Sequence, residues 1–196
     1  MSIKTIFAII SLASGFALFL PYFIGIWKNE TKPHLLTWVT WFILTGLGFV
    51  LSYTAGGGAG AFTFALQSIL CLFIAIYALI KREKNITRVD WMIFTFAIII
   101  MSFYALTKNA LLSAIFAATV DCLGYIPTFR KSYLRPYQEP PLTYTMASVS
   151  WLFSIFALNA FSVTTLIYPI ALVVVNGAFV LFLFIRRKAV GNDVTL

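Results

Sequence analysis

The chain has 196 residues, of which 61% are hydrophobic and 10% charged, and its mean hydropathy is +0.95. A soluble domain carries about 25% charged residues, so this composition excludes a water-soluble globular protein and indicates that lipid surrounds most of the chain. The formal net charge of +8 is spread over short clusters between apolar runs, which excludes a continuous nucleic-acid-binding patch.

Seven apolar runs reach about the 20 residues that a membrane-spanning helix needs. Helices are expected because a helix satisfies its own backbone hydrogen bonds in hydrocarbon. The first run is too long for the apolar core of a signal peptide, so we interpret it as a retained span. In chain order the predicted spans are Thr5–Trp27, Leu35–Tyr53, Gly58–Ile80, Val89–Thr107, Ala110–Phe129, Thr143–Ala160 and Thr164–Ile185.

The basic residues predict the orientation of these spans. Lys4 and Lys108 fall on one side, and the other twelve fall on the opposite side. Those twelve are Lys28, Lys32, Lys81, Arg82, Lys84, Arg88, Arg130, Lys131, Arg135, Arg186, Arg187 and Lys188. The positive-inside rule then places the N-terminus outside and the C-terminus in the cytoplasm. We expect a multi-pass protein of the plasma (inner) membrane.

The chain also repeats itself at an offset of 106 to 110 residues. The matching pairs are Leu20-Pro21 with Ile126-Pro127, Thr40-Trp41 with Ser150-Trp151, and Gln67-Ser68 with Asn176-Gly177. Spans one to three therefore repeat as spans five to seven, and the fourth span inverts the chain so that the two repeats run parallel. The predicted units are the first repeat at 1–84, the inverter helix at 85–108, the second repeat at 109–188 and a cytoplasmic tail at 189–196.

Five polar or aromatic residues fall in the middle third of their spans. At a rise of about 1.5 Å per residue, Gln67, Asp121 and Asn176 lie roughly 14–18 Å deep, and Trp41 and Trp151 roughly 9–12 Å deep. Two amides suit a hydroxyl-rich or amide-rich ligand, and two indoles offer flat faces to a sugar ring or a heteroaromatic base. The alternatives are interhelical hydrogen bonds for the amides and packing or an interfacial belt for the tryptophans.

Other residues receive more specific roles. Thr40 and Ser150 are secondary candidates for binding the substrate. Pro21 and Pro127 interrupt the backbone hydrogen-bond ladder and are predicted hinges, with a static kink as the alternative. Asp121 is the one acidic residue clearly inside a span, and an acid at that depth is suited to a proton-coupling role. The alternative for Asp121 is a structural acid held by hydrogen bonds.

Three spans, one inverter and three further spans, with a proline in the first helix of each half, resemble the SWEET sugar transporters and the wider PQ-loop superfamily. The resemblance covers most of the chain. Its most specific part is Asp121-Cys122-Leu123-Gly124-Tyr125-Ile126-Pro127, followed by Arg130-Lys131 and Trp151. The glutamine that names the PQ loop is absent, because Tyr22 follows Pro21 and Thr128 follows Pro127.

The resemblance implies roles for several residues. Asn176 looks like the pocket asparagine of SWEETs, and Gln67 stands where that family has a second asparagine. Asp121 resembles the aspartate that proton-coupled members carry upstream of the PQ position. In such a fold the two prolines would be hinges for rocking between outward-open and inward-open states.

The predicted function is a facilitator or proton-coupled carrier for a small polar solute, with a sugar as the expected class. Alternatives are a non-transporting receptor on the same fold, of the KDEL-receptor type, and an amino-acid or vitamin carrier of the PQ-loop type. No enzyme, metal or cofactor is expected, because no nucleophile–base or metal constellation shares one depth. The expected partners are the solute and the lipid bilayer, without nucleic acid, and the sequence leaves a homo-oligomer open.

Overall fold

The computed structural model describes residues 2–28, 33, 35–81, 88–134 and 136–193. Over these residues the chain forms nine α-helices and two short 3-10 turns, with no strand. The elements are α1 (Ile3–Ala17), α2 (Leu20–Trp27), α3 (Leu35–Thr54), η1 (Gly58–Ala61), α4 (Phe62–Lys81), α5 (Arg88–Thr107), α6 (Ala110–Gly124), α7 (Ile126–Leu134), η2 (Pro136–Gln138), α8 (Pro141–Phe156) and α9 (Val163–Asp193).

The first and fifth predicted spans are each broken into two helices at equivalent places. A turn at Leu18 and Phe19 separates α1 from α2, and a turn at Tyr125 separates α6 from α7. In both cases a proline follows as the second residue of the next helix, Pro21 in α2 and Pro127 in α7. Proline has no backbone N–H and clashes with the preceding turn, which explains why the helix breaks just before it.

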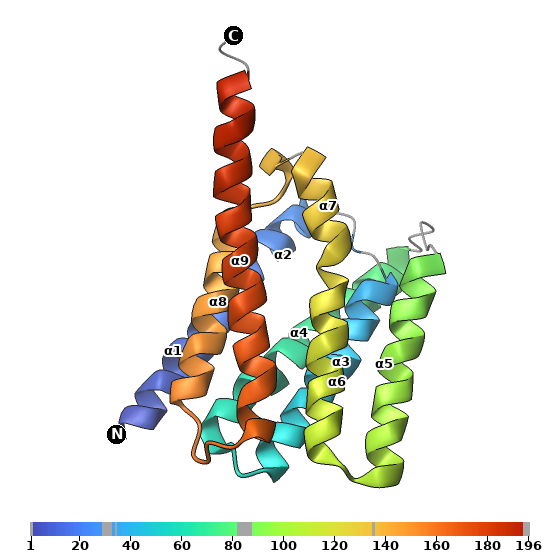
Figure 1. Ribbon diagram of the computed structural model, residues 1–196, viewed down its shortest axis with the longest axis vertical. Helices are drawn as coiled ribbons and strands as arrows, with labels where there is room; N and C mark the ends of the chain where they lie inside the picture. The colour runs from blue at the N-terminus through green and yellow to red at the C-terminus, as the bar shows by residue number, and fades with distance from the viewer. Residues whose placement is uncertain (1, 29–32, 34, 82–87, 135, 194–196) are drawn as a thin grey trace.

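The helices pack in two sets, shown in Figure 1. In the first helix set (α1–α4), α4 packs against both α1 and α3, and in the second helix set (α6–α9), α9 packs against both α6 and α8. The two sets meet where α1 packs along α8 and where α3 packs along α6. Helix α5 lies outside this arrangement, against α3 and α6.

The two ends of the bundle differ in charge. The start of α1, the turn after α3 and the loop between α8 and α9 lie at one end, which we call the N-terminal end; α2, α7 and the end of α9 lie toward the other, the basic end (Figure 1). Lys28, Lys81, Arg88 and residues 186–188 lie at the basic end. The predicted basic residues Lys32, Arg82, Lys84 and Arg135 fall outside the described residues.

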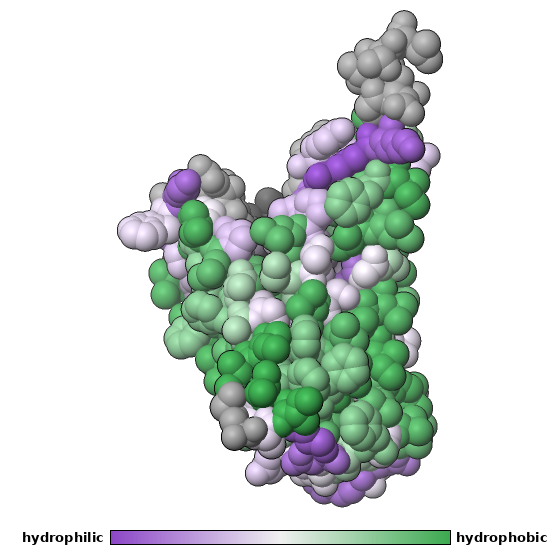
Figure 2. All heavy atoms as spheres, turned by 90° about the vertical axis from the view of Figure 1, so that its left-hand side faces the viewer, coloured by the Kyte–Doolittle hydropathy of each residue, from purple (hydrophilic) through white to green (hydrophobic). Residues whose placement is uncertain are grey.

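Five helical segments are long and apolar enough to cross a membrane, judged by length and composition. They are Ile3–Trp27, Leu35–Thr54, Gly58–Lys81, Arg88–Thr107 and Val163–Val190. Figure 2 shows apolar side chains over the middle of one face, with hydrophilic side chains gathered toward the two ends. Large side chains on α4, α5 and α9 point outward, such as Phe73, Trp91 and Phe184. Exposing such a surface is unfavourable in water and favourable in lipid. The protein is therefore an all-α, membrane-embedded, multi-pass protein.

Several predicted boundaries shift in the structure. Helix α8 has 16 residues and ends at Phe156, four residues before the predicted end of the sixth span. Helix α9 continues to Asp193, past the predicted end of the seventh span and into the predicted tail. Its continuation has a physical reason, because the guanidinium groups of Arg186 and Arg187 lie 4.2 and 5.0 Å from the ring centres of Tyr133 and Tyr137. Cation–π contacts of this kind hold α9, at the start of its extra length, against α7 and η2.

Candidate functional site

A cavity of about 520 Å³ lies between the two helix sets. It begins in the middle of the bundle and extends to the basic end, where its wall includes the exposed Pro21 and Pro140. Its walls come from α2, α3 and α4 of the first set and from α6, α7, α8 and α9 of the second. A solute in this cavity would touch both sets at once.

Six of the nine residues with predicted roles line this cavity. They are Pro21, Trp41, Gln67, Asp121, Trp151 and Asn176. They come from six different helices and are up to 155 residues apart in the chain. The expected convergence at one depth therefore corresponds to one cavity in the structure.

Thr40 and Ser150 do not line the cavity. Both are buried, but each precedes a lining tryptophan by one residue, and one residue is a rotation of about 100° around a helix. Thr40 faces the same buried side of α3 as Leu36 and Leu44, while the hydroxyl of Ser150 donates to the carbonyl of Ser11 on α1 at 2.8 Å. The depth of a residue in its span says nothing of this rotation, so depth alone could not separate Thr40 and Ser150 from the lining residues. Pro127 is the second residue of α7, and its side chain is not among those that the structure describes.

Asp121 is held in the cavity wall by neighbours from two other helices. Its carboxyl is 4% exposed and accepts a hydrogen bond from the Tyr168 hydroxyl at 2.8 Å. The side chain of Trp41 lies close to this carboxyl in the same cavity wall. One acidic group therefore connects α6 of the second set with α3 of the first and with α9.

The two amides differ in their remaining hydrogen-bonding capacity. The Asn176 amide donates to the Leu172 carbonyl at 2.7 Å, and its oxygen accepts from the Tyr125 hydroxyl at 3.0 Å. Gln67 is 8% exposed, and its Nε2 has no hydrogen-bond partner among the described residues. A buried donor without a partner costs about 1–3 kcal/mol, so a ligand oxygen in the cavity would relieve a penalty at Gln67. The Asn176 amide already makes hydrogen bonds within its own helix and with Tyr125.

Aromatic side chains form most of the remaining wall. Trp38 donates its indole N–H to the Tyr22 hydroxyl at 3.0 Å, with the two rings 4.7 Å apart. Trp38 also meets Trp41 edge to face at 5.1 Å. In the second set, Tyr125 lines the cavity from the turn between α6 and α7, and Tyr144 lines it from α8. These contacts fix the orientation of the rings before any ligand is bound.

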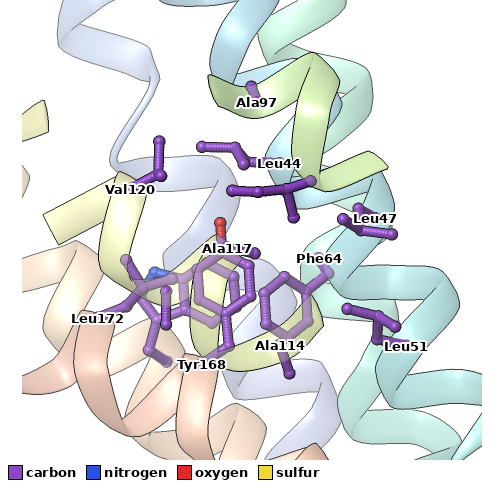
Figure 3. Close-up of a cluster of buried hydrophobic side chains, with 13 residues drawn as sticks. Leu44, Leu47, Leu51, Phe64, Ala97, Ala114, Ala117, Val120, Tyr168 and Leu172 are labelled. Atoms are coloured by element: carbon purple, nitrogen blue, oxygen red, sulfur yellow. The ribbon is translucent and has the colours of Figure 1, made fainter. Parts of the chain in front are cut away.

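The inner end of the cavity rests on the main hydrophobic cluster. Trp151 and Leu172 line the cavity and also belong to this cluster. Beneath them the ring of Phe64 lies 4.5 Å from Trp151 and 5.0 Å from Tyr168. Figure 3 shows Phe64 and Tyr168 side by side, with Leu172 next to Tyr168. This layer separates the cavity from the N-terminal end.

Beyond that layer the two helix sets are joined by hydrogen bonds. The Ser11 hydroxyl donates to the Ser150 carbonyl at 2.7 Å, and the Ser154 hydroxyl donates to the Gly60 carbonyl at 2.8 Å. The backbone N–H of Asn159 donates to Gly57 at 3.1 Å, and that of Ala160 donates to Gly56 at 3.2 Å. The cavity is thus closed toward the N-terminal end by contacts between the sets.

Sequence reasoning missed several cavity residues that share a helix face with the predicted ones. Leu172 precedes Asn176 by four residues on α9, Cys71 follows Gln67 by four on α4, and Thr45 follows Trp41 by four on α3. Residues at such spacings lie on one face of a helix. Extending each candidate along its own face would have found them.

The cavity belongs to a polytopic helical membrane protein, and its lining combines a carboxyl, two amides and aromatic rings. The described residues contain no group of three or more His, Cys, Asp or Glu side chains arranged to hold a metal ion. No family model matches this chain, and neither a curated protein nor a solved structure matches it.

Proposed function

We propose that the protein is a carrier that moves a small polar solute across the membrane by alternating access between the two helix sets. The observation that carries this proposal is the asymmetry of the cavity. It reaches the basic end, while contacts between the sets close it toward the N-terminal end. An alternating-access carrier has such a state, with its site at the interface of two repeats.

The packing of the helices supports two equivalent moving units. The contacts of α4 with α1 and α3 correspond to those of α9 with α6 and α8, and the contact of α1 with α8 corresponds to that of α6 with α3. A twofold relation exchanges these pairs. Each set also begins with a helix broken ahead of a proline, which is a suitable place for a hinge.

The proposal includes a more detailed arrangement. The broken helices count as one span each, and α8 as another, which gives seven spans with the N-terminus outside and the basic end in the cytoplasm. A helix of 16 residues spans about 24 Å, so α8 crosses only with the help of its flanking loop residues. In this orientation the cavity is open inward. The resemblance to SWEET and PQ-loop transporters suggests a sugar as the solute and Asp121 as a proton-coupling group.

The unpartnered amide of Gln67 supports a polar solute in particular. A hydroxyl or carbonyl oxygen placed near Nε2 would supply its missing acceptor. The flat faces of Trp41 and Trp151 line the same cavity and would pack on a ring.

The second candidate is a receptor that binds a ligand in the same cavity without transport. The hydrogen bonds that close the N-terminal end favour the receptor, because a cavity that stays closed at one end needs such contacts. The two functions differ in whether the closed end ever opens.

Tracer flux in proteoliposomes separates them. The protein would be reconstituted and tested with radiolabelled glucose, alanine and choline inside or outside the vesicles. A carrier moves at least one solute faster than protein-free vesicles do, and Gln67→Leu slows that flux while Thr119→Val, on the exposed face of α6, does not. Binding of a solute without any flux would support the receptor and contradict the carrier.

A further inference from the structure

The charge of the cavity lining is one-sided. Asp121 and Glu139 line it, and among its described lining residues there is no lysine, arginine or histidine. Glu139 accepts a hydrogen bond from the Tyr144 hydroxyl at 2.8 Å near the mouth, whereas Asp121 is in the interior. The hydrogen bond to Asp121 comes from a neutral group, the Tyr168 hydroxyl, and Trp41 beside it is also neutral, so the described contacts stabilise the carboxyl without neutralising it.

Aromatic side chains form much of the wall of the cavity that contains this acid. Six tyrosine and tryptophan side chains line the cavity, namely Tyr22, Trp38, Trp41, Tyr125, Tyr144 and Trp151. The face of an aromatic ring carries negative electrostatic potential and attracts a cation placed over it. A cavity lined by several aromatic rings and a carboxyl has the chemistry that binds substituted ammonium groups.

A third feature concerns the uncharged part of the ligand. Gln67 is more than nine-tenths buried, lines the same cavity, and its Nε2 has no partner among the described residues. A donor of this kind calls for an acceptor oxygen on the ligand. The cavity thus offers a place for a cation, and a rotation of the Gln67 amide, whose Nε2 is itself buried, would turn this donor toward a hydroxyl or carbonyl oxygen.

We infer that the solute is an organic cation, an ammonium group joined to a short chain or ring that carries an oxygen acceptor. The cationic nitrogen lies between Asp121 and the aromatic walls, and the oxygen accepts from Gln67. This inference rests on the proposed function in that it names the solute class of the same cavity. It ranks uncharged sugars below organic cations, because a sugar hydroxyl can donate a hydrogen bond to Asp121 but forms no ion pair with it.

A pair of ligands of nearly the same shape tests the inference. Choline carries a quaternary ammonium and a hydroxyl, and 3,3-dimethyl-1-butanol replaces the nitrogen by a neutral carbon. The full chain would be placed in nanodiscs of phosphatidylethanolamine and phosphatidylglycerol, which carry no choline headgroup. Binding of tritiated choline would be measured, and its displacement by unlabelled choline, by the neutral alcohol and by glucose would be compared.

We expect choline to bind about tenfold or more tightly than its neutral analogue, because the ion pair with Asp121 adds about fivefold or more to cation–π contacts worth about twofold in a cavity open to water. Asp121→Asn should lower the preference for choline to about twofold or less, and Trp41→Leu should lower it partly. Matched controls are Asp90→Asn and Trp91→Leu, which make the same changes on α5 outside the cavity. Both controls should retain the preference, and thermal unfolding of all variants reports whether they fold.

The outcomes separate this inference from the proposed function. Equal binding of choline and its neutral analogue, tighter binding of glucose, or no choline binding would overturn the inference. Flux of glucose in proteoliposomes would then still support the carrier. Choline binding that depends on Asp121, without flux of any solute, would support the cation site and overturn the carrier.

Discussion

If the protein is the proposed carrier, the hydrogen bonds that close the N-terminal end set the balance between its two states. The triple variant Ser11→Ala/Ser150→Ala/Ser154→Ala removes three side-chain bonds between the helix sets. Interhelical hydrogen bonds in membrane proteins average about 0.6 kcal/mol each, so the closed end loses about 1.8 kcal/mol. That loss corresponds to about a twentyfold shift toward the state that is open at the N-terminal end.

Spin labels at this end measure the shift. Thr54→Cys at the end of α3 and Phe161→Cys in the loop before α9 place exposed labels on opposite sets. The natural cysteines, Cys71 and Cys122, would be replaced by alanine. Double electron–electron resonance should show one short distance in the parent and a substantial population at a longer distance in the triple variant.

A matched variant distinguishes this effect from a general loss of hydroxyl groups. Ser14→Ala/Ser113→Ala/Thr119→Ala also removes three hydroxyls, but each of them donates within its own helix or to its helix cap. We expect this control to keep the short distance. The reasoning is refuted if the triple variant keeps the parent distribution, or if the control opens to the same extent.

Three further predictions concern single residues. Gly48→Ala should lower the free energy of unfolding by about 1–3 kcal/mol, because a Cβ there would lie 2.7 Å from the Phe64 ring. Gly124→Ala is the control, since a Cβ there would meet nothing within 4 Å and should change thermal unfolding little. Equal effects of the two changes on thermal unfolding would contradict this packing argument. Pro21→Ala should slow solute flux more than it weakens solute binding, since an alanine restores the backbone donor at the helix break; equal loss of both would argue against a hinge. Asp121→Asn should make uptake independent of an imposed pH gradient in proteoliposomes, because the amide does not titrate; a response like that of the parent would exclude coupling through this residue.

Much of the fold could be predicted from the sequence because apolar length is a direct consequence of the lipid solvent. The second predicted span, Leu35–Tyr53, differs from α3 by one residue at its end, and the fourth, Val89–Thr107, differs from α5 by one at its start. The prediction of an all-α multi-pass membrane protein is confirmed at that level. The count of seven spans and their orientation stay predictions, since α6 and α8 have 15 and 16 residues.

Some residues of the candidate site could also be predicted from the sequence, again because the solvent is lipid. Gln67, Asp121 and Asn176 are polar groups at bilayer depth, and the cost of burying them in lipid turns each toward the cavity. Tyr168 could not be recognised in the same way, because a tyrosine is also common in packing and at membrane interfaces. Its importance comes from the contact with Asp121, 47 residues earlier in the chain, which only the packing of α6 against α9 creates.

Opening of the N-terminal end is the central claim, and a reversible cross-link tests it. Gly56 and Ala160 lie on opposite sets, and a Cβ at Gly56 would be 3.3 Å from that of Ala160, close to the range of about 3.5–4.5 Å found in disulfides. Gly56 has a φ of +84°, so a cysteine there costs about 1–2 kcal/mol. This cost is the same in the oxidised and reduced forms, so comparing the two isolates the effect of the cross-link.

The measurement is solute flux through Gly56→Cys/Ala160→Cys in proteoliposomes, in a background without the natural cysteines. We expect the oxidised protein to bind solute from the basic end but to move none across the membrane, and the reductant dithiothreitol to restore flux. Undiminished flux through the fully cross-linked protein would contradict alternating access between the two helix sets.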